Sequence, residues 1–421
     1  MATTPSQLSG LFKESYGDDV KNLVPEAAKL VRLVPFVPRD KEIGNKYHQP
    51  VIVSQEHGVT YAAFDAGAFS LNAAISMQMQ DAQVSSAQLL LRSALSYDAA
   101  ARASNSKKAF VAATELLVEN MMESITKRLE IACLYGGTGI GATSSSSNQS
   151  ATTTLITFTT ASWATGIWAG AENAKIQFYT AVPALVSSGA DSIFTVTQVN
   201  AVNRTVLVTG TATGITALDT AIAAGTCTAY FNGAFGNEMS GLDKIMTNTG
   251  TLFNISALTY NLWASNSYSS GSAALTMGKL LNAVALAVNR GLNEDVTAMV
   301  NPRTWTNLMS DLAALRRFDG SYDRKKLESG AQAITFHGQN GMIDIVSHNC
   351  VKEGEAFVFP AKRLIRVGAW DVSFKTPGRG DEEIFTQLAD NAGYELRVYT
   401  DQALFSEAPA RMVKVTSIVN S

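Results

Sequence analysis

The longest regular pattern of apolar residues in the chain predicts a helix over residues 106–135. Apolar side chains recur there every three or four residues and form one stripe along a helix: Phe110, Leu117, Met121, Ile125 and Leu129. Polar residues at 104–106 can cap its start, and Gly136 and Gly137 can end it. Such a helix is about 45 Å long. We therefore expect a spine along which a sheet can pack.

A two-residue alternation predicts a long two-stranded flap over residues 47–95. Residues 51–53 and 59–61 are apolar enough to form the first part of it. In the second part, three apolar side chains alternate with polar ones, as in a strand with one covered face: Ile75, Met77 and Met79. An isolated ribbon is only marginally stable in water, so we expect the flap to lie on another surface.

The first 46 residues predict an arm. They have mixed charge, are interrupted by four prolines, and contain one short amphipathic helix at about 25–33. Since they offer too few apolar residues for a core of their own, we expect them to lie on another surface.

The middle of the chain predicts a small all-β insertion over residues 155–236. Short apolar runs at 176–179, 193–196 and 205–208 are typical of strands, with a hairpin turn between the last two. Between residues 131 and 237 the chain has few charges: Glu172, Lys175, Asp191, Arg204 and Asp219. The surface of this insertion is therefore expected to consist of Ser, Thr and Asn.

The last part of the chain mixes helices and strands. One helix is predicted from Thr276 to Gly291, and a second begins at Asn301 with Pro302 at its first position. Strands are predicted by the apolar runs at 296–300, 343–346, 356–359, 364–374, 385–400 and 412–415. The predicted fold class of the whole chain is α+β.

Composition narrows the function classes. Only 16% of the 421 residues are charged, against about 25% in an average globular protein. The net charge of −3 argues against a protein that binds nucleic acid in bulk. Low charge also indicates a surface largely covered by other copies of the chain. We expect no membrane span and no export, because long apolar runs and signal-peptide features are absent.

No motif for catalysis, cofactor binding or metal binding is found. The three cysteines and four histidines are scattered and match no disulfide framework or metal signature. The glycine-rich segment at 135–141 follows a predicted helix, whereas phosphate loops precede one. The acidic cluster at 381–383 is interpreted as a solvated turn. We therefore expect a protein that is not an enzyme and has no cofactor.

The order of these parts resembles the major capsid proteins of tailed bacteriophages, which have the Hong Kong 97-like fold. No single segment is diagnostic, and the resemblance rests on the order and spacing of five of them. These are Val34-Pro35, residues 44–51 (GNKYHQPV), 129–136 (LEIACLYG), 300–305 (VNPRTW) and 407–413 (EAPARMV).

The resemblance implies a domain organisation. Its parts are an N-terminal arm (1–46), an extended flap or E-loop (47–95), a peripheral domain (96–154 and 350–403) with the spine helix, and an axial domain (237–349 and 404–421). The β-rich insertion (155–236) lies outside the resemblance.

The resemblance also implies a function. The chain would self-assemble into the pentamers and hexamers of an icosahedral phage head that encloses double-stranded DNA, contacted weakly and without sequence specificity. It would be assembled in the host bacterial cytoplasm and would end in the virion. A portal is an implied partner, and a decoration protein is a further candidate.

Two departures from the best-known member of this family modify these expectations. That member begins with a long helical scaffold region, whereas here the capsid-like part starts within the first residues. We therefore expect a separate scaffolding protein, or a fusion removed earlier. That member also cross-links its flap through a lysine, and residues 47–106 contain no lysine. A covalent bond from the flap is therefore not expected.

We expect contacts between subunits in the flap and in the basic clusters: Val59, Tyr61, Met77, Met79, Lys107, Lys108, Arg316, Arg317, Arg324 and Lys325. Two interpretations of the basic clusters are open. They are either solvated helix ends or sites that contact an acidic neighbouring subunit or packaged phosphates. Two alternatives to a phage head stay open. One is an encapsulin-like nanocompartment shell. The other is a β-rich carbohydrate-binding or adhesive protein, which the missing signal peptide and the long helix disfavour.

Overall fold

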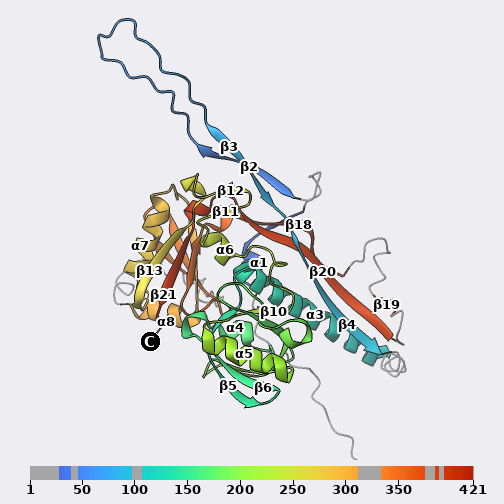
Figure 1. Ribbon diagram of the computed structural model, residues 1–421. Coiled ribbons are helices and arrows are strands. Elements are labelled where there is room, and N and C mark those ends of the chain that lie inside the picture. Colours follow the sequence, from blue (N-terminus) through green and yellow to red (C-terminus); the bar gives the residue numbers. More distant parts are fainter. Residues whose placement is uncertain are drawn as a thin grey trace, which may run out of the picture.

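A computed structural model describes residues 28–38, 46–96, 107–311, 333–374, 385–387 and 393–420. Helices and sheets form a body, a barrel lies at one end of it, and a long hairpin projects from the other end (Figure 1). The predicted α+β class is confirmed by this arrangement.

The predicted spine is helix α3 (Lys107–Tyr135), which is 29 residues long. It packs against a sheet in the order β1 (Phe36–Pro38), β18 (Leu364–Ser373), β20 (Gly393–Ser406) and β19 (Phe385–Gln387), with β4 (Ala87–Ser96) also paired to β20. Met121 and Ile125 of the helix are buried against Leu396 and Val398 of β20. The helix stripe and the strand alternation thus meet in one core.

The end of the spine depends on a glycine. A Cβ atom at Gly136 would lie 2.3 Å from the carbonyl oxygen of Met239, so no larger residue fits there without movement of the backbone. The N–H of Gly241 donates to the carbonyl of Gly136 at 2.9 Å. This close crossing attaches the end of the helix to the segment that follows the barrel.

A second, six-stranded sheet carries two helices. Its order is β13 (Asn266–Ala273), β21 (Val413–Ile418), β17 (Ala356–Phe359), β14 (Val296–Val300), β16 (Met342–Ser347) and β15 (Ala333–His337). Helix α7 (Met277–Val288) is capped by Thr276 and α8 (Pro302–Ser310) by Asn301, as predicted. The strand β17 belongs to this sheet, although the sequence placed residues 350–403 with the spine.

The inserted unit is a closed barrel in the order β10 (Thr228–Phe231), β5 (Gly141–Ser150), β6 (Thr153–Phe158), β9 (Thr205–Thr209), β8 (Phe194–Asn200) and β7 (Lys175–Tyr179). Two expectations were wrong. The unit begins near residue 141, not 155, because the Ser-rich β5 has no apolar alternation. It is also not all-β, because α5 (Ala212–Ala224) packs Ile215 and Leu218 into its core.

The C-terminal strands also differ from the prediction. Residues 385–400 are not one strand: β19 pairs antiparallel with β20, with Phe385 opposite Leu396. Residues 87–95 leave the flap and pair with β20. The polar face of β20 is partly covered, because Glu395 is buried against Arg92 and Arg397. Charge pairing therefore replaces apolar packing on that face.

The flap is a ribbon only at its base, where β2 (Tyr47–Ser54) pairs with β3 (Gln78–Val84). Residues 55–77 form no strands, so the strand predicted at 59–61 was wrong, and Met77 lies just outside β3. The two halves of this loop are joined by few hydrogen bonds, such as that from the His57 N–H to the carbonyl of Ile75 at 3.1 Å. Figure 1 shows the loop extending away from the body.

The described part of the arm lies on its own subunit. Helix α1 (Leu30–Leu33) packs on the spine, and β1 pairs in parallel with β18. Leu30 and Val34 are buried in the main core. Within the described ranges, the remaining short elements are α4 (Thr165–Trp168), α6 (Leu242–Met246), β11 (Thr251–Leu252), β12 (Ile255–Ser256) and 3-10 turns at 160–162, 189–192, 261–263, 361–363 and 409–411.

Candidate assembly surface

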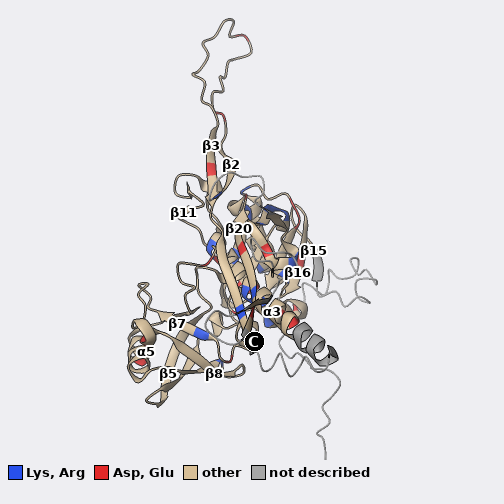
Figure 2. Cartoon of the chain, turned by 90° about the vertical axis from the view of Figure 1, so that its right-hand side faces the viewer, with Lys and Arg blue, Asp and Glu red and all other residues tan. Residues whose placement is uncertain are grey.

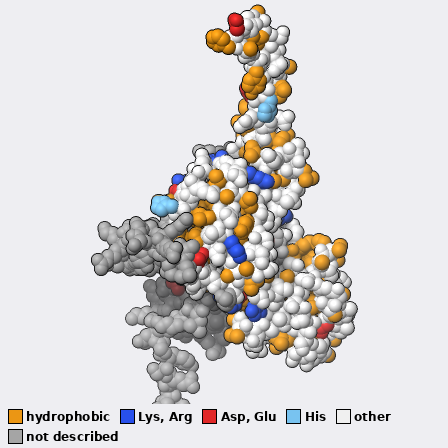
Figure 3. All heavy atoms as spheres, turned by 90° about the vertical axis from the view of Figure 1, so that its left-hand side faces the viewer, with side chains coloured by type: hydrophobic (Ala, Val, Ile, Leu, Met, Phe, Trp, Pro, Cys, Tyr) orange, Lys and Arg blue, Asp and Glu red, His pale blue; other side chains and the backbone are white. Residues whose placement is uncertain are grey.

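The flap exposes an unusual number of large apolar side chains. Tyr61 and Leu71 are 89% and 80% exposed, and Phe64 is fully exposed. The other exposed apolar side chains of the flap are Ile52, Val59, Phe69, Ile75, Met77 and Met79. Figure 3 shows these apolar groups along the projecting loop. Contiguous apolar exposure of this kind marks an interaction surface, because water contact with it is unfavourable.

The base of the flap is attached to the body by polar contacts. The Tyr260 hydroxyl donates to Gln78 Oε1 at 3.1 Å, and Gln80 Nε2 donates back to that hydroxyl at 3.2 Å. His48 Nδ1 lies 2.6 Å from Asp81 Oδ2 across the ribbon, and this hydrogen bond lowers the pKa of Asp81. The two Tyr260 contacts therefore join the flap to the body, and the His48–Asp81 contact joins the two strands of its base.

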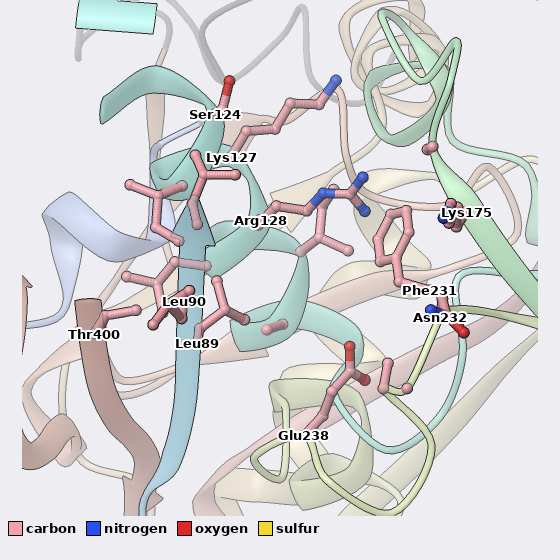
Figure 4. A pocket seen from close by; sticks show the side chains of 18 of the residues that line it. Leu89, Leu90, Ser124, Lys127, Arg128, Lys175, Phe231, Asn232, Glu238 and Thr400 are labelled. Carbon is pink, nitrogen blue, oxygen red and sulfur yellow. The ribbon is translucent and has the colours of Figure 1, made fainter. Parts of the chain in front are cut away.

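A cleft of about 820 Å³ lies between the spine helix, strand β4 and the barrel. Figure 4 shows Leu89 and Leu90 of β4 on one side of it and Phe231 on the other. The Arg128 guanidinium extends from the spine and stacks over the Phe231 ring, 3.4 Å from its centroid. Its Nη1 atom is buried without a hydrogen-bond partner, and burial lowers the pKa of Arg128 to about 10. Among the described residues, one nitrogen of the Arg128 guanidinium is therefore buried without a hydrogen-bond acceptor.

Glu238 lies at the edge of this cleft. Burial raises the pKa of its carboxyl, although the N–H of Gly137 donates to Oε2 at 3.3 Å. Arg128 and Glu238 attract one another but form no ion pair within 4 Å in the described part of the chain. The cleft thus separates two buried charges of opposite sign.

Glu238 should make stability depend on pH. Burial raises its folded-state pKa above the ordinary glutamate value of about 4.5, so the unfolded chain ionises first as the pH rises. Stability is therefore lost as the pH rises from about 4.5 through the folded pKa. We expect Glu238→Gln to match the wild type near pH 4 and to be more stable at pH 7. Denaturant unfolding at both pH values measures this, with the exposed Glu119→Gln as control; equal curves for Glu238→Gln and wild type at pH 7 would contradict it.

A buried carboxylate holds the arm to the spine. Glu130 of α3 is completely buried, and its Oε1 accepts from the N–H groups of Lys29 at 3.1 Å and Leu30 at 2.6 Å. Its Oε2 accepts from the N–H of Val31 at 2.8 Å. These donors are the first N–H groups of α1, which have no partner within their own helix. The spine therefore caps the arm helix with a side chain about 100 residues away in sequence.

His348 completes this cluster of Glu130 with α1, which we name the arm clasp. Its Nε2 lies 2.6 Å from Glu130 Oε1, and its Nδ1 accepts from the N–H of Cys350 at 3.0 Å. Since Nδ1 acts as acceptor, the proton is on Nε2 and is donated to the carboxylate. The Lys29 ammonium also donates to the carbonyl of Ser347 at 2.7 Å. The arm clasp joins the arm, the spine and the turn that begins at residue 347.

The structure places the ten predicted contact residues in three groups. Val59, Tyr61, Met77 and Met79 are exposed on the flap. Lys107 and Lys108 lie in the first turn of α3, and their side chains are outside the described part. The remaining four residues lie outside the described residues: Arg316, Arg317, Arg324 and Lys325.

Several residues of this surface were not predicted. Phe64 and Leu71 could have been found, because residues 55–77 contain only two charges and many apolar residues. Glu130 gave a weaker signal, as one carboxylate between the apolar residues of the spine stripe. The sequence contains no signal that identifies Arg128, because an arginine on a helix is usually solvated.

The described residues contain neither a metal-ligating cluster nor a membrane-spanning helix. No three side chains of His, Cys, Asp or Glu come together there to form a metal site. Among the helices in those ranges, none is long and apolar enough to cross a membrane. Figure 2 shows that the barrel carries few charged side chains, in agreement with its sequence.

Comparisons with known proteins identify the fold. No family model and no curated protein matches the sequence. Among solved structures, the capsid protein in the cyanophage A-1(L) capsid asymmetric unit matches with a TM-score of 0.57 and 11% identity, over 99% of both chains. The capsid protein of a native GTA particle matches with a TM-score of 0.53 and 8% identity, over 100% of both chains. The chain therefore has the fold of the tailed-phage capsid proteins, as the order of its parts predicted.

Proposed function

We propose that this chain is a capsid shell protein that assembles with copies of itself. The observation that carries the proposal is the flap, which extends from the body and exposes large apolar side chains that no described part of the chain covers. The fold match supports it, because both matched proteins were solved as parts of capsids. A surface of this kind becomes stable when neighbouring copies bury it.

The finer proposal is the major capsid protein of a phage head. The shell would be icosahedral, built from pentamers and hexamers, and would enclose double-stranded DNA in the virion. Assembly would take place in the host cytoplasm with a separate scaffolding protein and a portal, and a decoration protein is a further candidate. In this proposal the spine sheet is the peripheral domain, and the six-stranded sheet is the axial domain. Genes for a terminase, a portal and a scaffold beside this one would distinguish a phage head from an encapsulin-like shell.

Assembly should require the exposed apolar groups of the flap. We expect the wild-type chain to form closed shells or capsomer rings. A variant with Tyr61→Ser, Phe64→Ser and Leu71→Ser should associate roughly a thousandfold more weakly or worse, because each buried apolar side chain contributes about 1.5–3 kcal/mol. Sedimentation velocity and electron microscopy of the purified full chain measure this.

The control for the flap variant is Leu258→Ser. Leu258 is also highly exposed but lies outside the flap, so its replacement should leave association unchanged. Far-UV circular dichroism should be the same for all variants, because these side chains project into solvent. A wild-type chain that stays a dispersed monomer at every concentration would contradict the shell function, and unimpaired shells of the triple variant would contradict the role of the flap.

A further inference from the structure

We propose that Lys414 and Asp243 condense to form an isopeptide bond within one chain, with Glu355 as the group that moves the proton. The bond would join the C-terminal strand β21 to helix α6, which follows the barrel in the sequence. Since both partners belong to the same subunit, the reaction does not depend on the assembly of a shell.

The three side chains meet in the interior of the subunit. The Lys414 ammonium donates to Asp243 Oδ1 and, at 2.9 Å, to Glu355 Oε1. Lys414 and Asp243 are both buried, and Glu355 is partly buried. Helix α6 packs on the spine helix and on β21, so the two elements that carry the pair are in direct contact (Figure 1). An amine, a carboxyl group that it can attack and a second carboxylate are therefore held together.

The surroundings of this pair favour an uncharged product. The Phe357 ring centroid lies 5.9 Å from the Lys414 Nζ atom, and the Phe357 and Tyr135 ring centroids are 5.9 Å apart. Two charges in such a place keep much of their desolvation cost, even when they are paired. An amide has no net charge, so condensation would remove this cost while the contact between α6 and β21 is kept.

The reaction balances without any further reactant. Burial lowers the pKa of the Lys414 amine, but the charges of Glu355 and Asp243 raise it overall, so Lys414 starts as the ammonium ion. One ammonium proton moves to the Asp243 carboxylate, and the freed electron pair of Nζ attacks Asp243 Cγ to form the C–N bond. Glu355 takes a second proton from Nζ and passes it to the hydroxyl group, so the C–O bond breaks and water leaves. One ammonium and one carboxylate thus become one amide and one water.

Glu355 is well placed for this proton transfer. Its Oε1 accepts from Lys414, and its Oε2 is buried without a hydrogen-bond partner in the described part of the chain. A carboxylate in this position can accept a proton from the amine and return it to the leaving oxygen. Groups held in contact in this way react as if at an effective concentration of roughly 10⁵ M or more. The Glu355 side chain is 20% exposed, so the released water can leave beside it.

Mass spectrometry of the denatured wild-type chain tests the proposal without any substitution. The protein should be about 18 Da lighter than its sequence, because one water is lost in the covalent modification. After cleavage at methionine with cyanogen bromide, fragment 240–246, which contains Asp243, should remain joined to fragment 413–421, which contains Lys414. A chain with the full sequence mass would overturn the proposal. So would the same loss confined to fragment 240–246, because it would be a succinimide of Asp243.

Three variants identify the groups that take part. Lys414→Arg keeps the positive charge but should give no joined fragments, and Glu355→Gln should give less than a tenth of the wild-type amount. The matched control is Lys244→Arg, because Lys244 is exposed beside Asp243 on α6, and it should join as the wild type does. Far-UV circular dichroism checks the fold of each variant, and the wild-type measurement decides the matter if Lys414→Arg folds poorly. Joined fragments in Lys414→Arg would overturn the bond, and undiminished joining in Glu355→Gln would overturn the role of Glu355.

Discussion

Replacing Glu130 with alanine is expected to destabilise the subunit by about 3–5 kcal/mol, because one member of a buried charged hydrogen-bonded cluster is lost. In this variant, four donors of the arm clasp lose their acceptor. They are the backbone N–H groups of Lys29, Leu30 and Val31 and the Nε2–H of His348. Each unsatisfied buried donor costs about 1–3 kcal/mol, part of which water recovers if the arm detaches. The expected result is therefore a detached arm on a weakened body.

Two measurements separate arm detachment from general unfolding. Hydrogen exchange at the amides of Leu30 and Val31 should lose its protection, while amides of β14 keep theirs. Denaturant unfolding gives the overall loss. Glu119→Ala, an exposed position on the same helix, is the control and should change stability by less than about 0.5 kcal/mol. Protected Leu30 and Val31 amides in Glu130→Ala would show that the clasp does not hold the arm.

The parts that could be predicted are those whose local signals agree with their tertiary environment. The spine has an apolar stripe and a glycine end, and α7 and α8 have caps at Thr276 and Asn301 that bond as the sequence indicates. The strand β14 is apolar except for Thr297, because both of its faces are buried. For these elements, local propensity and burial give the same answer.

The parts that were missed depend on long-range pairing. The strand β5 is almost entirely Ser, Thr and Asn, so its pairing with β6 and β10 has no periodic signal. The break between β19 and β20 was missed because both segments are strand-like, although Asp390 and Asn391 between them and Gly393 at the start of β20 are residues that favour turns. Strand β4 was assigned to the flap because alternation does not say which partner a strand has.

The candidate surface was predictable in kind but not in detail. The flap could be identified as needing a neighbour, because it has too little apolar contact within the chain, and Tyr61 and Met79 are indeed exposed. The arm clasp and the cleft were not predictable. Each joins side chains to backbone or rings far away in sequence, such as Glu130 with Leu30 and Arg128 with Phe231. The spacing of residues along the sequence does not indicate contacts over such distances.

The second large expected effect concerns the attachment of the barrel to the body. Trp168 is completely buried, stacks on Trp163 with ring centroids 5.9 Å apart, and lies 4.7 Å from the Phe158 ring. The same segment bonds to the body, since the N–H of Gly166 donates to the carbonyl of Asn349 at 3.0 Å. Trp168→Ala should cost about 3–5 kcal/mol, because it opens a large cavity where the barrel and the body share one core.

A second substitution, Trp168→Phe, tests this prediction because it keeps an aromatic ring but removes the indole N–H. The indole N–H of Trp168 is buried without a hydrogen-bond partner, so Trp168→Phe removes an unsatisfied donor while leaving a smaller cavity. We expect Trp168→Phe to lose less than half of the stability that Trp168→Ala loses in denaturant unfolding. Trp370→Ala is the control, because Trp370 is 42% exposed and its loss should be about 1 kcal/mol or less. A loss of stability in Trp168→Ala no larger than that in Trp370→Ala would contradict this prediction. The barrel would then be held by its backbone hydrogen bonds to residues 349–354, which do not involve the indole, and not by the aromatic core.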